Sequence, residues 1–180
     1  MPHAFFLGEI EKAELFKGSG AISLSYAVVP GNAGWSLKDG NINGETHINE
    51  SESIHGGVLN HPIDWHYITS TSEGWPFLVV EVWERDWDGT SRLFKGCGSV
   101  FLPTTPGSHK LSLSLWRPRQ VRGVAGFIDM VLPPKLDIKE VRKFIAAPYT
   151  RPHFQTETCG TVQVTIHTVL EGFKKNGCLV

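Results

Sequence analysis

Cysteine is scarce in this sequence, and its spacing excludes two common uses. Cys97, Cys159 and Cys178 are an odd number of residues and include no CxxC pair. Small disulfide-linked proteins carry a denser and usually even set of cysteines, and structural zinc sites use closely spaced pairs. We therefore expect reduced thiols and no cysteine-based metal site.

Long hydrophobic runs are also absent. No segment approaches the ~20 consecutive apolar residues that a membrane-spanning helix requires. The opening residues, MPHAFFLGEIEKAELF, lack a basic start, and Glu9 interrupts their apolar run after a few positions, unlike a secretion signal. These features predict a cytoplasmic protein.

The sequence lacks the motifs of the common enzyme classes. It contains no GxSxG nucleophile elbow, no phosphate-binding P-loop and no dinucleotide-binding glycine pattern. His109, His153 and His167 lie far apart in the chain without an obvious nucleophile beside them. No basic helix or RNA-binding signature is present either. We therefore predict a protein that is not an enzyme, has no cofactor and does not bind nucleic acid.

Strand-like patterns fill most of the 180 residues, a length suited to a single domain over residues 1–180. Leucines alternate with serines in KLSLSLW (110–116), and TVQVTIHT (161–168) alternates similarly, as in strands with one buried face. FLVVEVW (77–83) is apolar at nearly every position, as in a central strand covered on both sides. The other strand-like runs are HAFFLGEI (3–10), AISLSYAVV (21–29), DWHYITS (64–70) and GCGSVFLP (96–103). Short strands separated by Gly- and Pro-containing turns predict an all-β protein, an antiparallel β-sandwich.

A helix is expected only late in the chain. Asp137 can cap the N-terminus of a helix, with Glu140 three residues later. The apolar residues that follow at helical spacing are Ile138, Val141, Phe144 and Ile145. VRGVAGFIDMV (121–131) has weaker helical character, because Gly123 and Gly126 lower its helix propensity. The sandwich is therefore expected to carry one or two short helices inserted late in the chain.

Charge is distributed unevenly, although the net charge is only -1. Between Lys110 and Pro152 nine basic residues accompany three acidic ones, so the rest of the chain carries an excess of seven negative charges. A solvated surface explains such segregation, and so does a face for an anionic partner or an anionic membrane. The basic residues predicted to contact lipid or an anionic partner are Arg117, Arg119, Arg122, Lys139, Arg142 and Lys143.

An acidic turn follows the predicted central strand. Asp86 and Asp88 stand one residue apart and precede Gly89, an arrangement that suits both a calcium-binding loop and a tight hairpin turn. Calcium prefers about six to eight oxygen ligands, and the candidate second loop, IEKAELFKGSG (10–20), offers no aspartate. The flanking Arg85 and Arg92 would also repel the cation. A hairpin turn is the favoured interpretation, with calcium binding at Asp86 and Asp88 as the alternative.

HPIDWH (61–66) places three metal-competent side chains close together in sequence. On a strand Asp64 and His66 share one face, whereas His61 stands before Pro62 and need not join them. Because zinc usually takes three or four ligands, a polar strand face is the favoured interpretation.

The tryptophans divide into two groups. Those in or beside predicted strands are most simply core residues, and they are Trp65, Trp75, Trp83 and Trp116. Trp35 and Trp87 lie in predicted turns, where an indole can be an interaction hot spot or an anchor in lipid headgroups.

Several motifs, found in a fixed order along the chain, indicate a resemblance to a known family. They are HPID (61–64), GWP (74–76), VW at the end of the central strand, GCG followed by VFLP, PG with His109, and WRP (116–118). On these motifs the chain resembles the B9 domain family over nearly its whole length, except about residues 119–158. The motif residues expected to be structural are His61, Pro62, Ile63, Asp64, Gly74, Trp75, Pro76, Trp116, Arg117 and Pro118.

The resemblance implies a C2-like β-sandwich and a place at the cilium base, in the complex of the transition zone and near the basal body. There B9 proteins associate and help to gate the entry of membrane proteins into the cilium. The implied function is that of a non-enzymatic scaffold required for ciliogenesis, whose partners are other B9 domain proteins and transition-zone complex members.

A C2-type membrane-lipid-binding module is the alternative function. Calcium-dependent C2 domains usually carry aspartates in two loops, whereas this sequence supplies them in one. The resemblance therefore favours calcium-independent docking on an anionic membrane surface, to which each lysine or arginine would contribute ~1 kcal/mol.

Overall fold

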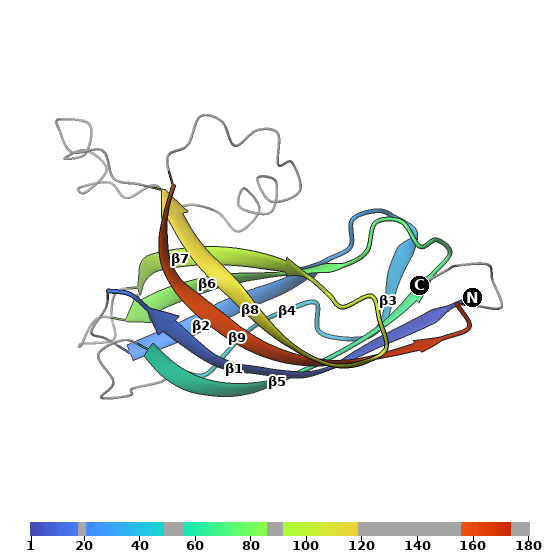
Figure 1. Cartoon of the computed structure of the whole chain (residues 1–180), viewed down its shortest axis with the longest axis horizontal. Helices are drawn as coiled ribbons and strands as arrows, with labels where there is room; N and C mark the ends of the chain where they lie inside the picture. The colour runs from blue at the N-terminus through green and yellow to red at the C-terminus, as the bar shows by residue number, and fades with distance from the viewer. Residues whose placement is uncertain (18–20, 49–55, 86–91, 119–155, 174–180) are drawn as a thin grey trace.

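Strands are the dominant element of the chain and pair into one curled antiparallel sheet. The computed structural model describes residues 1–17, 21–48, 56–85, 92–118 and 156–173. Within these ranges nine strands follow the order β3-β5-β1-β9-β8-β7-β6-β2-β4, and each neighbouring pair is antiparallel (Figure 1). The strands are β1 (His3–Leu15), β2 (Ala21–Val29), β3 (Trp35–Gly40), β4 (Asn43–Glu45), β5 (Gly56–Thr69), β6 (Phe77–Arg85), β7 (Arg92–Phe101), β8 (Gly107–Pro118) and β9 (Thr156–Glu171).

Seven of the strands coincide with the strand-like patterns of the sequence. In β8 Leu113 and Leu115 are buried while Ser112 and Ser114 are exposed, as the alternation predicts. The apolar run of β6 is covered on both sides, because one set of its side chains joins the main core and the other packs beside Cys97. The predicted helices in residues 121–131 and 137–145 lie outside the described residues. Among the described residues, no helix is long and apolar enough to cross a membrane.

The curl of the sheet brings its two edge strands, β3 and β4, toward each other. β3 and β4 are the outermost strands of the sheet and are consecutive in sequence, so their connection runs from the β5 side to the β2 side. In this connection the Asn41 carbonyl accepts a hydrogen bond from the Trp65 indole of β5 at 2.8 Å. The next carbonyl, that of Ile42, accepts one from the Val28 amide of β2 at 2.7 Å. The connection therefore links β5 to β2 and closes the sheet into two layers.

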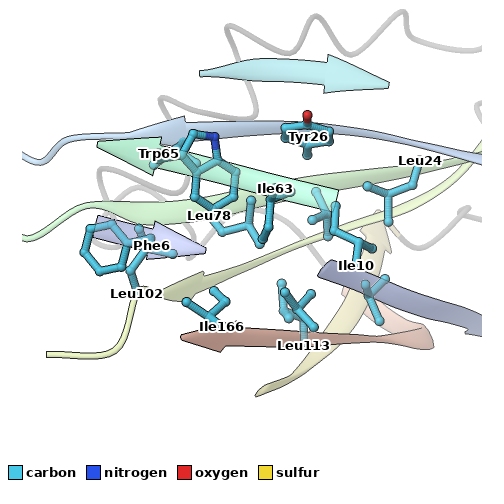
Figure 2. Packing of buried hydrophobic residues seen from close by; sticks show 14 of the residues in the cluster. Phe6, Ile10, Leu24, Tyr26, Ile63, Trp65, Leu78, Leu102, Leu113 and Ile166 are labelled. Carbon is cyan, nitrogen blue, oxygen red and sulfur yellow. The ribbon is translucent and has the colours of Figure 1, made fainter. Parts of the chain in front are cut away.

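The core lies between these layers. Side chains of β1, β5, β8 and β9 meet those of β2 and β6 in one apolar cluster. Figure 2 shows Trp65, Ile166 and Leu113 from the first group and Leu24 and Tyr26 from the second directed into the shared space. The predicted all-β, C2-like antiparallel sandwich is confirmed.

Candidate functional site

The strand ends that flank the two charged segments of the sequence lie at the same end of the sheet. The acidic pair Asp86 and Asp88 follows Arg85 of β6 in the sequence. Residues 119–155, which hold seven of the nine basic residues and are named here the basic segment, stand between Pro118 of β8 and Thr156 of β9. Because β6, β7, β8 and β9 are successive neighbours, these connections leave from one end (Figure 1). The predicted calcium and lipid ligands that lie outside the described residues are Asp86, Asp88, Arg119, Arg122, Lys139, Arg142 and Lys143. Their roles stay predictions.

Arg117 is the member of the predicted basic set that the structure describes. It stands opposite Glu157 in the β8–β9 register. Its Nε donates to Glu157 Oε1 at 2.6 Å, and one terminal nitrogen lies 2.6 Å from the same oxygen in an ion pair. Both side chains are partly exposed, so this pair contributes at most about 1 kcal/mol to stability. Arg117 would meet a lipid headgroup only by giving up its carboxylate partner.

A hollow of about 110 Å³ lies beside this ion pair. Lys95 lines it and is itself ion-paired with Glu84. Cys159 also lines it, and burial raises the pKa of the Cys159 thiol, with a smaller opposing effect from Arg117. A thiol that stays protonated is a poor nucleophile. Two ion pairs, an inert thiol and the exposed Lys17 therefore border this hollow.

The HPID motif borders a groove where β5 approaches β2. The groove measures about 280 Å³ and is lined by Tyr26, Gly40, Asn41, Pro62, Ile63, Asp64 and Trp65. The His61 ring and the Tyr26 hydroxyl are hydrogen-bonded at 3.2 Å, and Ile63 is buried in the core. Burial lowers the pKa of His61 and raises the pKa of Tyr26, which favours the uncharged form of both. His61 and Ile63 of the motif therefore help to join the two layers of the sandwich, whereas Pro62 and Asp64 are exposed beside the groove.

Pro62 lies where β5 extends beyond its partner β3, which pairs only with the later part of β5. The Ser70 amide donates to Gly34 on the β3 side, whereas the Thr69 amide donates to Pro2 on the β1 side. Successive amides of a strand point to alternate sides, and β5 pairs with β1 without interruption from His61 to Ile68. The amides of the even-numbered residues of β5 in this range therefore point away from β1. Pro62 has no N–H to present there, which discourages pairing with a foreign strand.

The metal-competent side chains of HPIDWH do not converge. His61 contacts Tyr26, whereas His66 lies on the other face and its Nε2 is 2.9 Å from His3 Nδ1. The His66 ring also stacks on Phe5, with centroids 4.1 Å apart. Across the part of the chain that the structure describes, no group of three or more His, Cys, Asp or Glu side chains is placed to hold a metal ion.

The GWP motif locks two loops at the opposite end of the sheet. Gly74 has a φ of 68°, a left-handed conformation that favours glycine, and its carbonyl accepts a hydrogen bond from the Gly31 amide at 2.9 Å. Trp75 meets Trp35 edge to face at 4.7 Å, and the Trp35 indole donates to the Glu73 carbonyl at 2.8 Å. Trp35 is thus a buried core residue and not an exposed anchor.

The WRP motif ends β8. Trp116 packs against the second core cluster with Cys97 and Phe77. The Cys97 thiol donates to the Trp116 carbonyl at 3.6 Å. Pro118 is the last residue of the strand. With the Arg117–Glu157 pair, the motif fastens β8 to β7 and β9 just before the basic segment.

Comparison with known proteins gives the family. A family model described as "Ciliary basal body-associated, B9 protein" matches residues 4–169, which run from β1 almost to the end of β9. The chain belongs to this B9 family. The motifs that tie the strands and loops together therefore belong to a B9 domain.

Individual relatives agree with the family match. B9 domain-containing protein 2 of Xenopus laevis is 29% identical over 143 residues, which cover 79% of this chain and 80% of the relative. The protein of the same name from Danio rerio is 33% identical over 118 residues, or 66% of each chain. Human "Tectonic-like complex member MKS1" is 34% identical over 99 residues, which are 52% of this chain and 18% of that protein. The resemblance to MKS1 thus concerns a B9-like part of a much longer chain.

One surface of this B9 chain was not indicated by the sequence. On the outer face of β1 and β9, Leu7 and Val169 are 41% and 51% exposed. The apolar run HAFFLGEI had predicted a strand without showing which of its side chains reach solvent. Only the register with β5 and β9 identifies Phe5 and Leu7 as outward-facing residues.

Proposed function

We propose that this B9 chain is a non-enzymatic scaffold subunit of the ciliary transition-zone complex, on the cytoplasmic side of the cilium base. Its partners would be other B9 domain proteins, and the assembled complex would help to gate membrane-protein entry into the cilium. The family match over residues 4–169 carries the proposal. It is supported by the similarity to MKS1, whose name describes it as a member of a tectonic-like complex.

The geometry of the described residues is consistent with a binding protein. The motif residues hold strands and loops together, and the two hollows are bordered by ion pairs, aromatic rings and backbone. A catalytic site would need a nucleophile, a base and an oxyanion-stabilising group in one place. Most of the described motif residues are engaged in packing and hydrogen bonds instead, and Pro62 and Asp64 are exposed beside the groove.

The test is reconstitution with other B9 proteins. The full chain, co-expressed with B9 proteins of the same organism that include its MKS1 relative, is expected to elute with at least one of them as a single species in size-exclusion chromatography. Its tagged form is expected at the cilium base, and its removal should reduce the number of ciliated cells. An unrelated C2 domain of similar size is the control. Failure to form a complex with any B9 protein would count strongly against the proposal.

Lipid binding is the second candidate, and one observation favours it. Phe16 is 59% exposed and stands beside the exposed Lys17, at the end of the sheet from which the basic segment leaves. An exposed aromatic beside cations suits the interface of an anionic membrane. The described cations Lys95 and Arg117 are ion-paired, so the segment after Pro118 would have to supply most of the attraction.

Co-sedimentation with phosphatidylserine vesicles tests this candidate. Joint neutralisation of Arg119, Arg122, Lys139, Arg142 and Lys143 is expected to abolish binding in chelator, because each cation contributes ~1 kcal/mol. The joint change Arg117→Gln and Glu157→Gln is the control and should change binding little, since it removes an ion pair whose net charge is zero. Binding that appears only with calcium would instead assign Asp86 and Asp88 to a metal site. Equal binding by the neutralised variant would eliminate the basic segment as the membrane contact.

A further inference from the structure

The outer face of β5, β1 and β9 forms a regular grid of side chains. In antiparallel pairs, directly opposed residues project to the same face. The register aligns the rows Ile68–His3–Glu171, His66–Phe5–Val169, Asp64–Leu7–His167 and Pro62–Glu9–Thr165. In β1, Ala4 and Phe6, which lie between these positions, and Ile10, which follows Glu9, are fully buried on the opposite side. The twelve grid residues are named here the β1 face.

The centre of the β1 face is apolar although it is exposed to solvent. An antiparallel sheet with one solvated side normally alternates apolar inward and polar outward residues. β8 obeys this rule, since Ser108, Ser112 and Ser114 are exposed on the same side of the sheet. β1 and β9 break it with Leu7, which is 41% exposed, and Val169, which is 51% exposed. Contiguous exposed apolar residues with a polar surround are typical of protein interaction sites.

Aromatic contacts hold this centre in a fixed shape. The His66 ring stacks on those of Phe5 and His3, at centroid distances of 4.1 and 5.2 Å. The hydrogen bond between His3 and His66 joins β1 to β5 on the outer side. A partner would therefore meet a preformed surface, which reduces the entropy cost of binding.

The charges of the β1 face have one sign. Asp64, Glu9 and Glu171 are exposed at its margin, and its twelve residues include no lysine or arginine. The neighbouring cations on this side of the sheet lie outside the β1 face: Lys110 of β8 stands opposite Thr165, and Lys12 of β1 stands opposite Gln163 and is ion-paired with Glu14. Carboxylates at this margin oppose an anionic membrane and favour a partner with basic residues. The margin also reaches the groove of the HPID motif, because Pro62 and Asp64 border both.

We propose that the β1 face is the docking surface for a protein partner that carries an apolar patch bordered by lysine or arginine. This inference rests on the proposed scaffold function and specifies the surface through which that function is exercised. Leu7, Phe5 and Val169 supply the buried contact. Asp64, Glu9 and Glu171 orient the partner and accelerate the encounter.

The experiment measures the affinity of full-length variants for the B9 protein that co-elutes with the wild-type chain. Leu7→Asp and Val169→Asp place a charge in the apolar centre and should each weaken binding at least about tenfold. Ser112→Asp and Ser114→Asp introduce the same charge on the same side of the sheet, outside the β1 face, and should change affinity less than about twofold. Unfolding curves in urea for all four variants verify that each is folded.

A second variant tests the charge argument. The triple change Glu9→Gln, Asp64→Asn and Glu171→Gln should slow association and reduce its dependence on salt, because the attraction between exposed charges is screened. The dissociation rate should change less. Unchanged association at low salt would overturn the requirement for a basic partner surface.

The remaining outcomes separate this inference from the proposed function. If the wild-type chain binds a B9 protein and both aspartate variants bind equally well, the β1 face is not the docking surface and the scaffold function stands. If the wild-type chain binds none, both fail together. Loss of wild-type self-association in Leu7→Asp would make a second copy of the chain the occupant. Loss of vesicle binding in that variant would make the occupant a membrane, and either result would overturn the proposed partner.

Discussion

Replacing Trp65 by alanine is expected to lower the free energy of unfolding by about 3–5 kcal/mol. The indole is 1% exposed, packs edge to face on Tyr26 at 6.2 Å and donates to the Asn41 carbonyl at 2.8 Å. It therefore fills the core and also fastens β5 to the connection between β3 and β4. Since small domains are stable by only about 5–15 kcal/mol, this single change would remove a large share of the total.

Urea unfolding of Trp65→Ala and Trp65→Phe separates the two roles of this side chain. Phenylalanine keeps most of the ring but removes the N–H donor, so it should cost about 1–3 kcal/mol for the unpaired Asn41 carbonyl and the lost volume. Trp83→Phe is a control for tryptophan replacement outside the main core, because Trp83 is only partly buried. An effect of Trp65→Ala below about 1 kcal/mol would show that the connection between β3 and β4 does not close the sandwich.

The strands that could be predicted are those in which burial repeats along the sequence. β8 and β9 show the period of two, and β6 shows the unbroken apolar run of a strand covered on both sides. β3 was missed because five of its six residues are exposed, so its sequence carries no alternation. β3 is defined by its hydrogen bonds with β5, and a pairing partner distant in sequence leaves no local pattern.

Contacts between distant residues account for what was missed at the candidate sites. The sequence pattern indicated that Arg117 is a free cation. Its partner Glu157 is distant in sequence and is placed opposite it only by the β8–β9 register. Trp35 read as a turn residue because glycines precede it, whereas its burial depends on Trp75 in another loop. Phe5 and Leu7 lie in an apolar run like that of β6, but the side chains on both sides of β6 are buried, whereas only one side of β1 is.

Gly8→Ala is expected to destabilise the fold by about 2–3 kcal/mol. Gly8 lies in the middle of β1, between β5 and β9. An added Cβ would stand 2.0 Å from the Thr165 carbonyl oxygen and 2.9 Å from its carbon. These are backbone atoms of β9, and β1 cannot move away from them within the sheet without crowding β5 on its other side. The lower chain entropy of alanine in the unfolded state would return only about 0.4–1 kcal/mol, so the steric cost prevails.

Gly34→Ala is the matched control for this prediction. There the added Cβ would meet the Thr71 methyl group at 2.4 Å, the end of a side chain that can rotate away. Its effect should stay below about 1 kcal/mol, and hydrogen exchange should accelerate at β1 and β9 amides only in Gly8→Ala. Because Gly8 separates Leu7 from Glu9 on the β1 face, the same displacement should weaken partner binding even where the variant remains folded. If Gly8→Ala were as stable as the wild type, the close approach of β1 to β9 would be relieved at little cost, and the β1 face would have to be regarded as adaptable instead of preformed.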